Sequence, residues 1–95
     1  MLKPEFSRGQ VASILGINTQ TIANREKSGK YPEPKRDSND FRCYTLEDVF
    51  ALQMISNGAI NPGSILDVMY DMGYRNQSKM TQILDETLNS YLGKK

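Results

Sequence analysis

A short run of amide, hydroxyl and cationic side chains has the chemistry to contact nucleic acid. Gln20, Asn24 and Lys27 follow one another at intervals of four and three residues, so they share one side of a helix. Thr21 and Arg25 lie beside them, and no acidic residue occurs in this stretch before Glu26. Amides and hydroxyls hydrogen-bond to base edges, whereas Arg and Lys also bind phosphates. The pattern therefore favours a base-reading surface over a merely solvated helix face.

Two helices joined by a tight turn are predicted to position this surface. Ser7 and Gln10 have the spacing of a capping box, which starts the first helix, and Gly16 ends it. Asn18 or Thr19 caps the second helix, so Thr19 serves either as a cap alone or also as a contact to nucleic acid. This spacing of helix, glycine-containing turn and helix predicts a helix-turn-helix.

A small β-hairpin, or wing, is predicted to follow the two helices. Pro32 and Pro34 exclude a helix interior, and the sequence Asp-Ser-Asn-Asp at 37–40 is a dense turn signal. Residues 41–44 combine aromatic and polar side chains as a short strand does. The arms of the hairpin carry three cations that we expect on phosphates: Lys35, Arg36 and Arg42. Arg42 has the alternative of pairing with an acidic side chain of a neighbouring helix.

Three further helices are predicted in the rest of the chain. Thr45, Ser64 and Asn76 are of the residue types that cap helices, and Asn57–Gly58 ends the first of the three. The apolar stripe of the last helix either covers the chain's own core or forms a seam between two subunits. The expected apolar positions are Leu46, Val49, Phe50, Leu52 and Ile55, then Ile65, Leu66, Val68, Met69 and Met72, and finally Met80, Ile83, Leu84, Leu88 and Tyr91.

The expected fold is therefore mostly α with a small β-hairpin wing. It consists of a winged helix-turn-helix domain over residues 1–57 and a C-terminal helical pair over residues 58–95, which packs on that domain or mediates dimerisation. The charge is unevenly distributed between the halves. Residues 1–44 carry eight Lys and Arg against five Asp and Glu, a net charge of +3, and residues 45–95 carry a net charge of −2. This polarity suits a nucleic-acid face in the first half.

The composition argues against enzyme and metal chemistry. Among the 95 residues there is no His and a single Cys, Cys43. Because His is the commonest general base and metal ligand, and no glycine-rich phosphate loop or nucleophile elbow is present, we expect no enzyme, no cofactor and no bound metal. No apolar run approaches the ~20 residues that span a membrane. Residues 1–5 also lack a signal-peptide core, so we expect a cytoplasmic protein without membrane contact.

The order of these features resembles the MerR-like winged-helix family. The likeness runs from Phe6 to Ile55, about half of the chain, and rests on several spaced features rather than on one short string. These features are Val11-Ala12-x-x-Leu15-Gly16-Ile17, Thr21-Ile22, Glu26-Lys27-x-Gly29, Pro34, Phe41-Arg42-x-Tyr44-Thr45-x-x-Asp48-Val49 and Leu52. The resemblance implies that the second helix enters the major groove of double-stranded DNA, that the wing touches the adjacent backbone or minor groove, and that the protein binds as a dimer.

Three departures from the family pattern modify this expectation. Many relatives carry Arg directly after the Thr-Ile pair, where this chain has Ala23, so a phosphate contact is lost or is supplied by Arg25. Relatives often have aromatic residues in place of Asn24 and Arg25. The long coiled-coil helix and effector-binding cysteines of full regulators are missing, so no small-molecule effector is evident.

A fainter likeness to the second helix-turn-helix of AraC-type regulators covers residues 65–84. It is carried by the run Met-Gly-Tyr-x-Asn-Gln-Ser at 72–78. The net negative charge of this half favours instead a simple helix stop at Gly73-Tyr74, because phosphate contact needs cations. If the likeness holds, it implies a second DNA surface composed of Arg75, Asn76, Gln77, Lys79 and Gln82.

From these observations we predict a sequence-specific double-stranded DNA-binding protein. Its expected role is that of a small transcriptional regulator, such as a repressor, that occupies an operator as a homodimer. A plasmid-partition or phage recombination accessory protein is the alternative that also binds DNA. A winged-helix protein-interaction adaptor is the alternative that does not. The predicted DNA-contacting residues are Thr19, Gln20, Thr21, Asn24, Arg25, Lys27, Lys35, Arg36 and Arg42.

Overall fold

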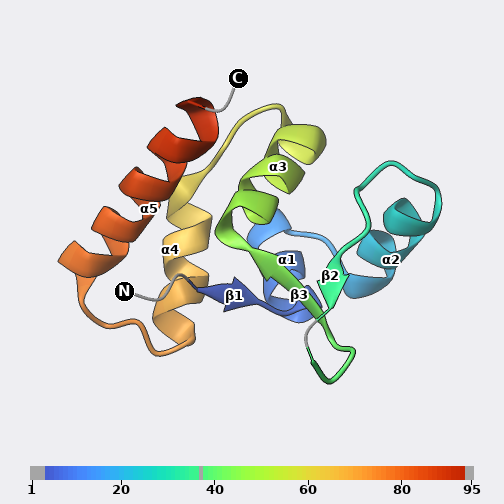
Figure 1. Cartoon of the computed structure of the whole chain (residues 1–95), viewed down its shortest axis with the longest axis horizontal. Helices are drawn as coiled ribbons and strands as arrows, with labels where there is room; N and C mark the ends of the chain where they lie inside the picture. The colour runs from blue at the N-terminus through green and yellow to red at the C-terminus, as the bar shows by residue number, and fades with distance from the viewer. Residues whose placement is uncertain (1–3, 37, 94–95) are drawn as a thin grey trace.

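The computed structural model describes residues 4–36 and 38–93, and in them five helices surround a small antiparallel sheet (Figure 1). The mostly helical fold with a small β-hairpin is confirmed. Residues 94–95, at the end of the predicted C-terminal helical pair, and Asp37 of the predicted turn lie outside the described residues. The elements in chain order are β1 (Glu5–Phe6), α1 (Arg8–Leu15), α2 (Thr19–Lys27), β2 (Lys35–Arg36), β3 (Arg42–Thr45), α3 (Leu46–Asn57), α4 (Pro62–Asp71) and α5 (Gln77–Gly93).

The predicted helix-turn-helix forms with the predicted caps. Ser7 and Gln10 make a reciprocal capping box at the start of α1, with hydrogen bonds of 3.2 Å and 2.8 Å between side chain and backbone. Gly16 then ends α1 with a φ of 73°, a left-handed conformation that glycine adopts without strain. Asn18, rather than Thr19, caps α2. The buried Ile22 of α2 anchors this helix in the core, so the opposite side of α2 faces outward.

The sheet has one more strand than the sequence predicted. The hairpin of β2 and β3 with its loop, residues 35–45, is called the wing below. Strand β3 is central, because β1 pairs with it on the other edge through Glu5 and Thr45 and through Phe6 and Tyr44. Phe6 of β1 is buried in the core.

Helices α4 and α5 cover the winged half from one side. Helix α4 packs on α1, and α5 packs on α3, where the rings of Phe50 and Tyr91 lie 5.8 Å apart. The apolar stripe of α5 therefore covers the chain's own core, which was one of its two predicted roles. Figure 1 places α2 and the α4–α5 pair at opposite ends of the molecule, so α2 remains open to a partner. Within the described ranges, no helix has both the length and the apolar character needed to cross a membrane.

Two predictions about the helices were wrong. Ser64 does not cap α4: Asn61 does, with Pro62 in the first helical position, where its missing N–H costs nothing. Ile55 was placed in the buried stripe of α3 but is 43% exposed, and the neighbouring Gln53 is buried instead. The Gln53 amide is accommodated because it bonds to the backbone of Asn61 and to the Ser64 hydroxyl. The amide thereby fixes the α3–α4 connection.

Candidate nucleic-acid interface

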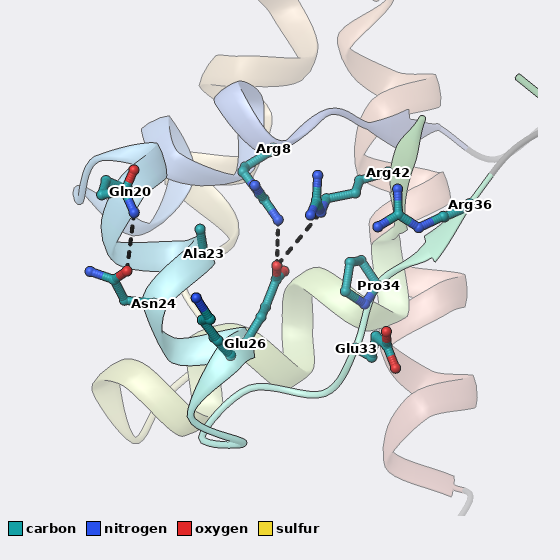
Figure 2. A pocket seen from close by; sticks show the side chains of 10 residues that line it. Arg8, Gln20, Ala23, Asn24, Glu26, Glu33, Pro34, Arg36 and Arg42 are labelled. Carbon is teal, nitrogen blue, oxygen red and sulfur yellow. Dashed lines mark hydrogen bonds and ion pairs between the residues drawn. The ribbon is translucent and has the colours of Figure 1, made fainter. Parts of the chain in front are cut away.

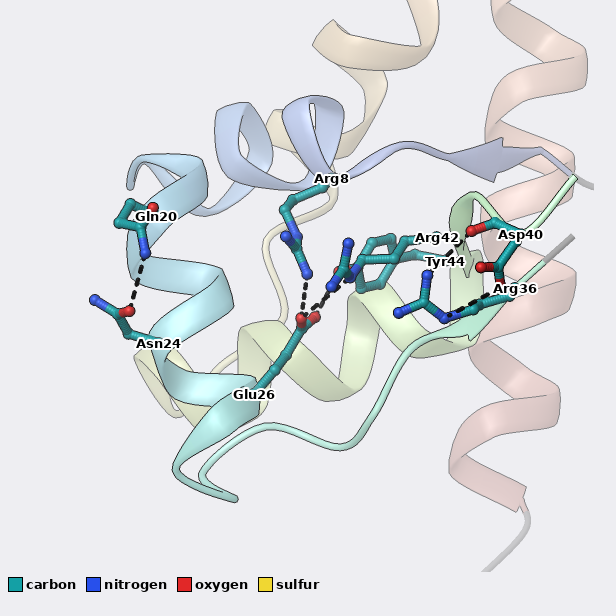
Figure 3. Close-up of polar contacts among 8 residues, drawn as sticks. All are labelled: Arg8, Gln20, Asn24, Glu26, Arg36, Asp40, Arg42 and Tyr44. Carbon is teal, nitrogen blue, oxygen red and sulfur yellow. Dashed lines mark hydrogen bonds and ion pairs between the residues drawn. The ribbon is translucent and has the colours of Figure 1, made fainter.

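The exposed face of α2 presents two amides beside each other. Gln20 Nε2 donates a hydrogen bond to Asn24 Oδ1 at 3.0 Å, and both side chains are exposed. They lie one helical turn apart on one side of α2 (Figure 3), and their spacing from the buried Ile22 puts them on the opposite side of the helix. An amide pair of this kind keeps donors and acceptors available, because each carboxamide carries two N–H groups and two lone pairs.

The two threonines at the start of α2 have different surroundings. Asn18 Oδ1 accepts hydrogen bonds from both the backbone N–H and the hydroxyl of Thr21, at 2.8 Å and 2.9 Å. The Thr21 hydroxyl is therefore already engaged in the helix cap, and its side chain is half-buried. Thr19 is exposed and lies on the first turn of α2.

Arg25 is held against the core and is not directed along the open face with Gln20 and Asn24. Its Nη1 donates to the Tyr31 hydroxyl at 2.7 Å, and its guanidinium lies 5.4 Å from the centre of the Tyr31 ring. Tyr31 is buried and its hydroxyl also contacts Ser56 of α3. Arg25 thus links the end of α2 to α3, and this contact competes with the base-reading role that was predicted for it.

Glu26 connects α2 to both α1 and the wing. Its Oε1 accepts from Arg8 Nη2 at 2.5 Å, and its Oε2 accepts from the Tyr44 hydroxyl at 2.5 Å. Arg42 Nε lies 3.9 Å from the same carboxylate, which is the acid pairing considered for Arg42. The Glu26 side chain is only 8% exposed. Because buried charges need partners, the three contacts together fix the position of α2 relative to α1 and the wing.

This cluster shifts two pKa values. Burial raises the pKa of Tyr44 to about 12, and the hydrogen bond to Glu26 adds to that effect. For Arg8, burial acts to lower the pKa, but the contacts with Tyr44 and Glu26 outweigh it and the pKa is raised. Tyr44 is therefore a neutral hydrogen-bond donor and Arg8 a permanent cation at neutral pH.

The pH dependence of stability tests this assignment of Tyr44. A folded-state pKa above the unfolded value means that Tyr44 stabilises the fold below pH 10 and loses this contribution as the pH rises towards about 12. We expect the free energy of unfolding to fall more steeply over this range in the parent protein than in Tyr44→Phe, which cannot ionise. Urea unfolding at several pH values measures the difference, and parallel curves would contradict the proton assignment.

The wing places two like charges opposite each other. Arg36 of β2 and Arg42 of β3 are direct cross-strand partners, and their side chains are 41% and 40% exposed. Like charges opposite each other in a sheet repel. Each arginine is partly neutralised by its own acid, since Arg36 Nε lies 3.6 Å from Asp40 and Arg42 approaches Glu26 (Figure 3). Such a pair would also be stabilised by an anion between the two guanidinium groups.

A groove of about 580 Å³ lies between α2 and the wing (Figure 2). Figure 2 shows Arg8 and Arg42 next to each other, both pointing towards the Glu26 carboxylate, with the Gln20–Asn24 pair further along α2. Four lining residues are cationic and two, Glu26 and Glu33, are acidic. The full lining is Arg8, Gln20, Ala23, Asn24, Glu26, Lys27, Glu33, Pro34, Arg36 and Arg42.

The groove brings together five of the nine predicted contact residues. These are Gln20, Asn24, Lys27, Arg36 and Arg42. Thr19, Thr21, Arg25 and Lys35 do not line it. Sequence reasoning missed Arg8 as a groove residue and Glu26 as its organiser. Two signals pointed towards this pairing: the acid partner considered for Arg42, and the presence of Glu26 and Phe41-Arg42-x-Tyr44 in the same family pattern.

The α4–α5 pair has a different polar surface. Arg75 lies over the ring of Tyr70 at 4.1 Å, and Gln82 donates to Glu86 within α5. Asn76 caps α5 as predicted, because its side chain accepts from Lys79 N at 3.1 Å. In residues 4–36 and 38–93, no group of three or more His, Cys, Asp or Glu side chains is arranged to hold a metal ion.

Comparisons with known proteins point to MerR-like transcriptional regulators. The chain is 33% identical to the HTH-type transcriptional regulator ZntR homolog of Haemophilus influenzae over 86 residues, which are 90% of this chain and 62% of that protein. It is 35% identical to the mercuric resistance operon regulatory protein of Bacillus cereus over 51 residues, 54% of this chain and 39% of that protein. Both are MerR-family regulators. The helix-turn-helix is MerR-like.

The chain matches only part of the length of each relative. A third similar protein is the type II methyltransferase M.Eco47II of Escherichia coli, 39% identical over 49 residues, which are 52% of this chain and only 12% of that protein. The chain thus spans less than two thirds of each of these relatives. The longer matches are to regulators, which supports a non-enzymatic protein. No family model and no solved structure matches the chain.

Proposed function

We propose that the chain is a sequence-specific double-stranded DNA-binding protein that regulates transcription from an operator as a homodimer in the cytoplasm. The observation that carries this proposal is the groove between α2 and the wing, where an amide pair and several cations share one surface. The exposed face belongs to a single α-helix, and the major groove of B-DNA is wide enough to admit one α-helix. The wing then lies beside it, over the neighbouring backbone.

The amides supply the base readout in this proposal. Gln20 and Asn24 are exposed and have free donors and acceptors beyond their mutual hydrogen bond. A carboxamide that donates to N7 and accepts from N6 distinguishes adenine from the other bases. Thr19 adds a hydroxyl at the exposed start of the helix, and Thr21 contributes its methyl group because its hydroxyl caps α2.

The cations supply the phosphate contacts. Lys27, Lys35, Arg36 and Arg42 are exposed on α2 and on both strands of the wing. Glu26 offsets this positive surface only in part, since its carboxylate is shared by Arg8, Tyr44 and Arg42. Arg25 acts indirectly, as a positioning residue that holds the end of α2 through Tyr31.

Selection of binding sequences from a random duplex pool tests the proposal. The expected result is a preferred sequence with two half-sites, since a symmetric dimer binds a palindromic or repeated site. Binding should weaken steeply with salt. A folded protein that binds no duplex at low salt, or that binds all duplexes equally, would contradict the proposal.

Substitution of one amide tests the base readout. We expect Asn24→Ala to relax discrimination at one base position by about 1–3 kcal/mol while binding to unrelated duplex stays the same. Asn89→Ala, an exposed asparagine of α5, is the matched control and should change neither quantity. Competition titrations with single-base variants of the selected duplex measure both effects. Equal discrimination by Asn24→Ala and the parent would place the base contact elsewhere.

A further inference from the structure

Two stretches of the chain contain no charged residue. The first is residues 49–66, between Asp48 and Asp67, where the 24% of charged residues in the whole sequence would place about four. The second is residues 87–93, which follow Glu86. They comprise most of α3, the α3–α4 connection, the start of α4 and the last turns of α5. The surface that these two stretches form together is called the uncharged face below.

The fold brings the two uncharged stretches together. Helix α5 packs on α3, and the rings of Phe50 and Tyr91 lie 5.8 Å apart. Figure 1 shows the C-terminal ends of α3 and α5 at one edge of the molecule and the loop of the wing at the opposite edge. Among the described residues, none that lines the groove between α2 and the wing belongs to either stretch. A partner on the uncharged face therefore leaves that groove open.

The uncharged face carries exposed apolar side chains. Met54 and Ile55 of α3 and Leu92 of α5 are between 43% and 49% exposed. They are three of the five large apolar side chains that are exposed among residues 4–36 and 38–93. One such side chain would need no explanation. Three of them on a surface without charges match the centre of a protein interface, where charged residues are depleted and methionine is enriched.

We propose that a second copy of the chain docks on the uncharged face, with Met54, Ile55 and Leu92 at the centre of the interface. A two-fold dimer sets the same patch of both subunits against itself, so the patch must be complementary to itself. A surface without charges meets its own copy without repulsion between like charges. The exposed amides of Asn57 and Asn89 both donate and accept hydrogen bonds, so they also suit such contacts. The inference rests on the homodimer of the proposed function and names its interface.

The other faces of the molecule are less suited to a second copy. The α2 helix and the wing expose cations, which would repel those of another subunit across a two-fold axis. The apolar stripe of α5 is already buried against the chain's own core. The outer side of α4 and α5 exposes four carboxylates, those of Asp67, Asp71, Asp85 and Glu86. The uncharged face is also large enough, since 13 residues of 49–66 and six of 87–93 are not buried, close to the about 20 per partner in a standard interface.

Sedimentation equilibrium of the full chain without DNA tests the inference. We expect the parent to dimerise and Ile55→Glu to raise the dimer dissociation constant about 30-fold, the effect of losing one interface hot spot. Leu92→Glu should do the same, and its place in the last turn of α5 makes damage to the fold small. Circular dichroism shows whether each variant is folded. Both variants should bind a single half-site of the selected duplex as the parent does, because the groove is intact, but lose cooperative binding to the two half-sites.

Tyr70→Glu is the matched control. Tyr70 is a similarly exposed large side chain of α4 outside the uncharged face, and the same new charge there should leave the dissociation constant of the dimer unchanged. The inference is overturned if the parent stays monomeric at about 100 μM, if folded Ile55→Glu and Leu92→Glu dimerise as the parent does, or if Tyr70→Glu weakens the dimer equally. A parent that dimerises through this face but binds no duplex would instead contradict the proposed DNA binding and support the interface.

Discussion

Glu26→Ala will lower the free energy of unfolding by about 3 kcal/mol, the largest effect that we expect from a single substitution. The Glu26 carboxylate is 8% exposed and accepts hydrogen bonds from Arg8 and Tyr44. Its removal leaves the Arg8 guanidinium and the Tyr44 hydroxyl without their acceptor in a partly buried site. Buried donors that lose their acceptor destabilise the fold by more than the original hydrogen bond stabilised it. Urea unfolding followed by circular dichroism measures the change.

Glu33→Ala is the matched control for this prediction. Glu33 lines the same groove and carries the same charge, but its side chain is exposed. Its replacement should change the free energy of unfolding by less than about 0.5 kcal/mol, as surface substitutions usually do. Glu26→Gln keeps the shape of the side chain and loses its charge, so its free energy of unfolding should lie between those of Glu26→Ala and Glu33→Ala. Equal stability of Glu26→Ala and Glu33→Ala would show that the carboxylate does not join α2 to the wing.

Arg36→Ala will weaken binding to all duplex sequences alike and will reduce the salt dependence. Arg36 is 41% exposed on the open side of the wing, and its acid partner Asp40 is itself exposed. If Arg36 contacts one phosphate, its loss should reduce the slope of log affinity against log salt by about 0.9. The preferred sequence should remain the same, because a phosphate contact carries no base information. Titrations of the selected duplex and of an unrelated duplex at several salt concentrations measure both quantities.

Arg75→Ala controls for the change in net charge. Arg75 is exposed in the turn between α4 and α5, at the end of the molecule away from α2 (Figure 1). Its replacement should leave the salt slope close to that of the parent. If Arg75→Ala reduces the slope as much as Arg36→Ala does, the wing has no special role and the second surface suggested by residues 65–84 gains support.

The local features of the fold were predictable because their signals are short-range. The capping box of Ser7 and Gln10 and the caps at Asn18 and Thr45 depend on residues three positions apart. The left-handed ends at Gly16 and Gly58 depend on one residue each. Such signals are visible in the sequence, so the helices of the N-terminal half and the start of α5 were placed correctly.

The features that were predicted wrongly or missed depend on partners distant in the sequence. A two-residue strand such as β1 has no periodicity, and only its pairing with β3 defines it. Gln53 is buried because Asn61 and Ser64 satisfy its amide, which the apolar pattern of α3 cannot reveal. Once Asn61 and Pro62 start α4, Ser64 becomes a residue of its first turn.

The candidate site was predictable in its chemistry but not in its internal bonding. The polar face of α2 and the cations of the wing follow from residue type and helical or strand spacing. The cluster around Glu26 joins residues 18 positions apart on either side, Arg8 and Tyr44, and only the folded chain brings them together. The same is true of Arg25, whose contact with Tyr31 directs it away from the open face.

Backbone amide chemical shifts recorded during titration with the selected duplex test the central claim most directly, namely that DNA occupies the groove between α2 and the wing. We predict that the largest changes fall on residues 19–27 and 35–45, with further changes at Arg8 and small ones in α4 and α5. Changes concentrated in α4 and α5, with α2 and the wing unaffected, would contradict the account.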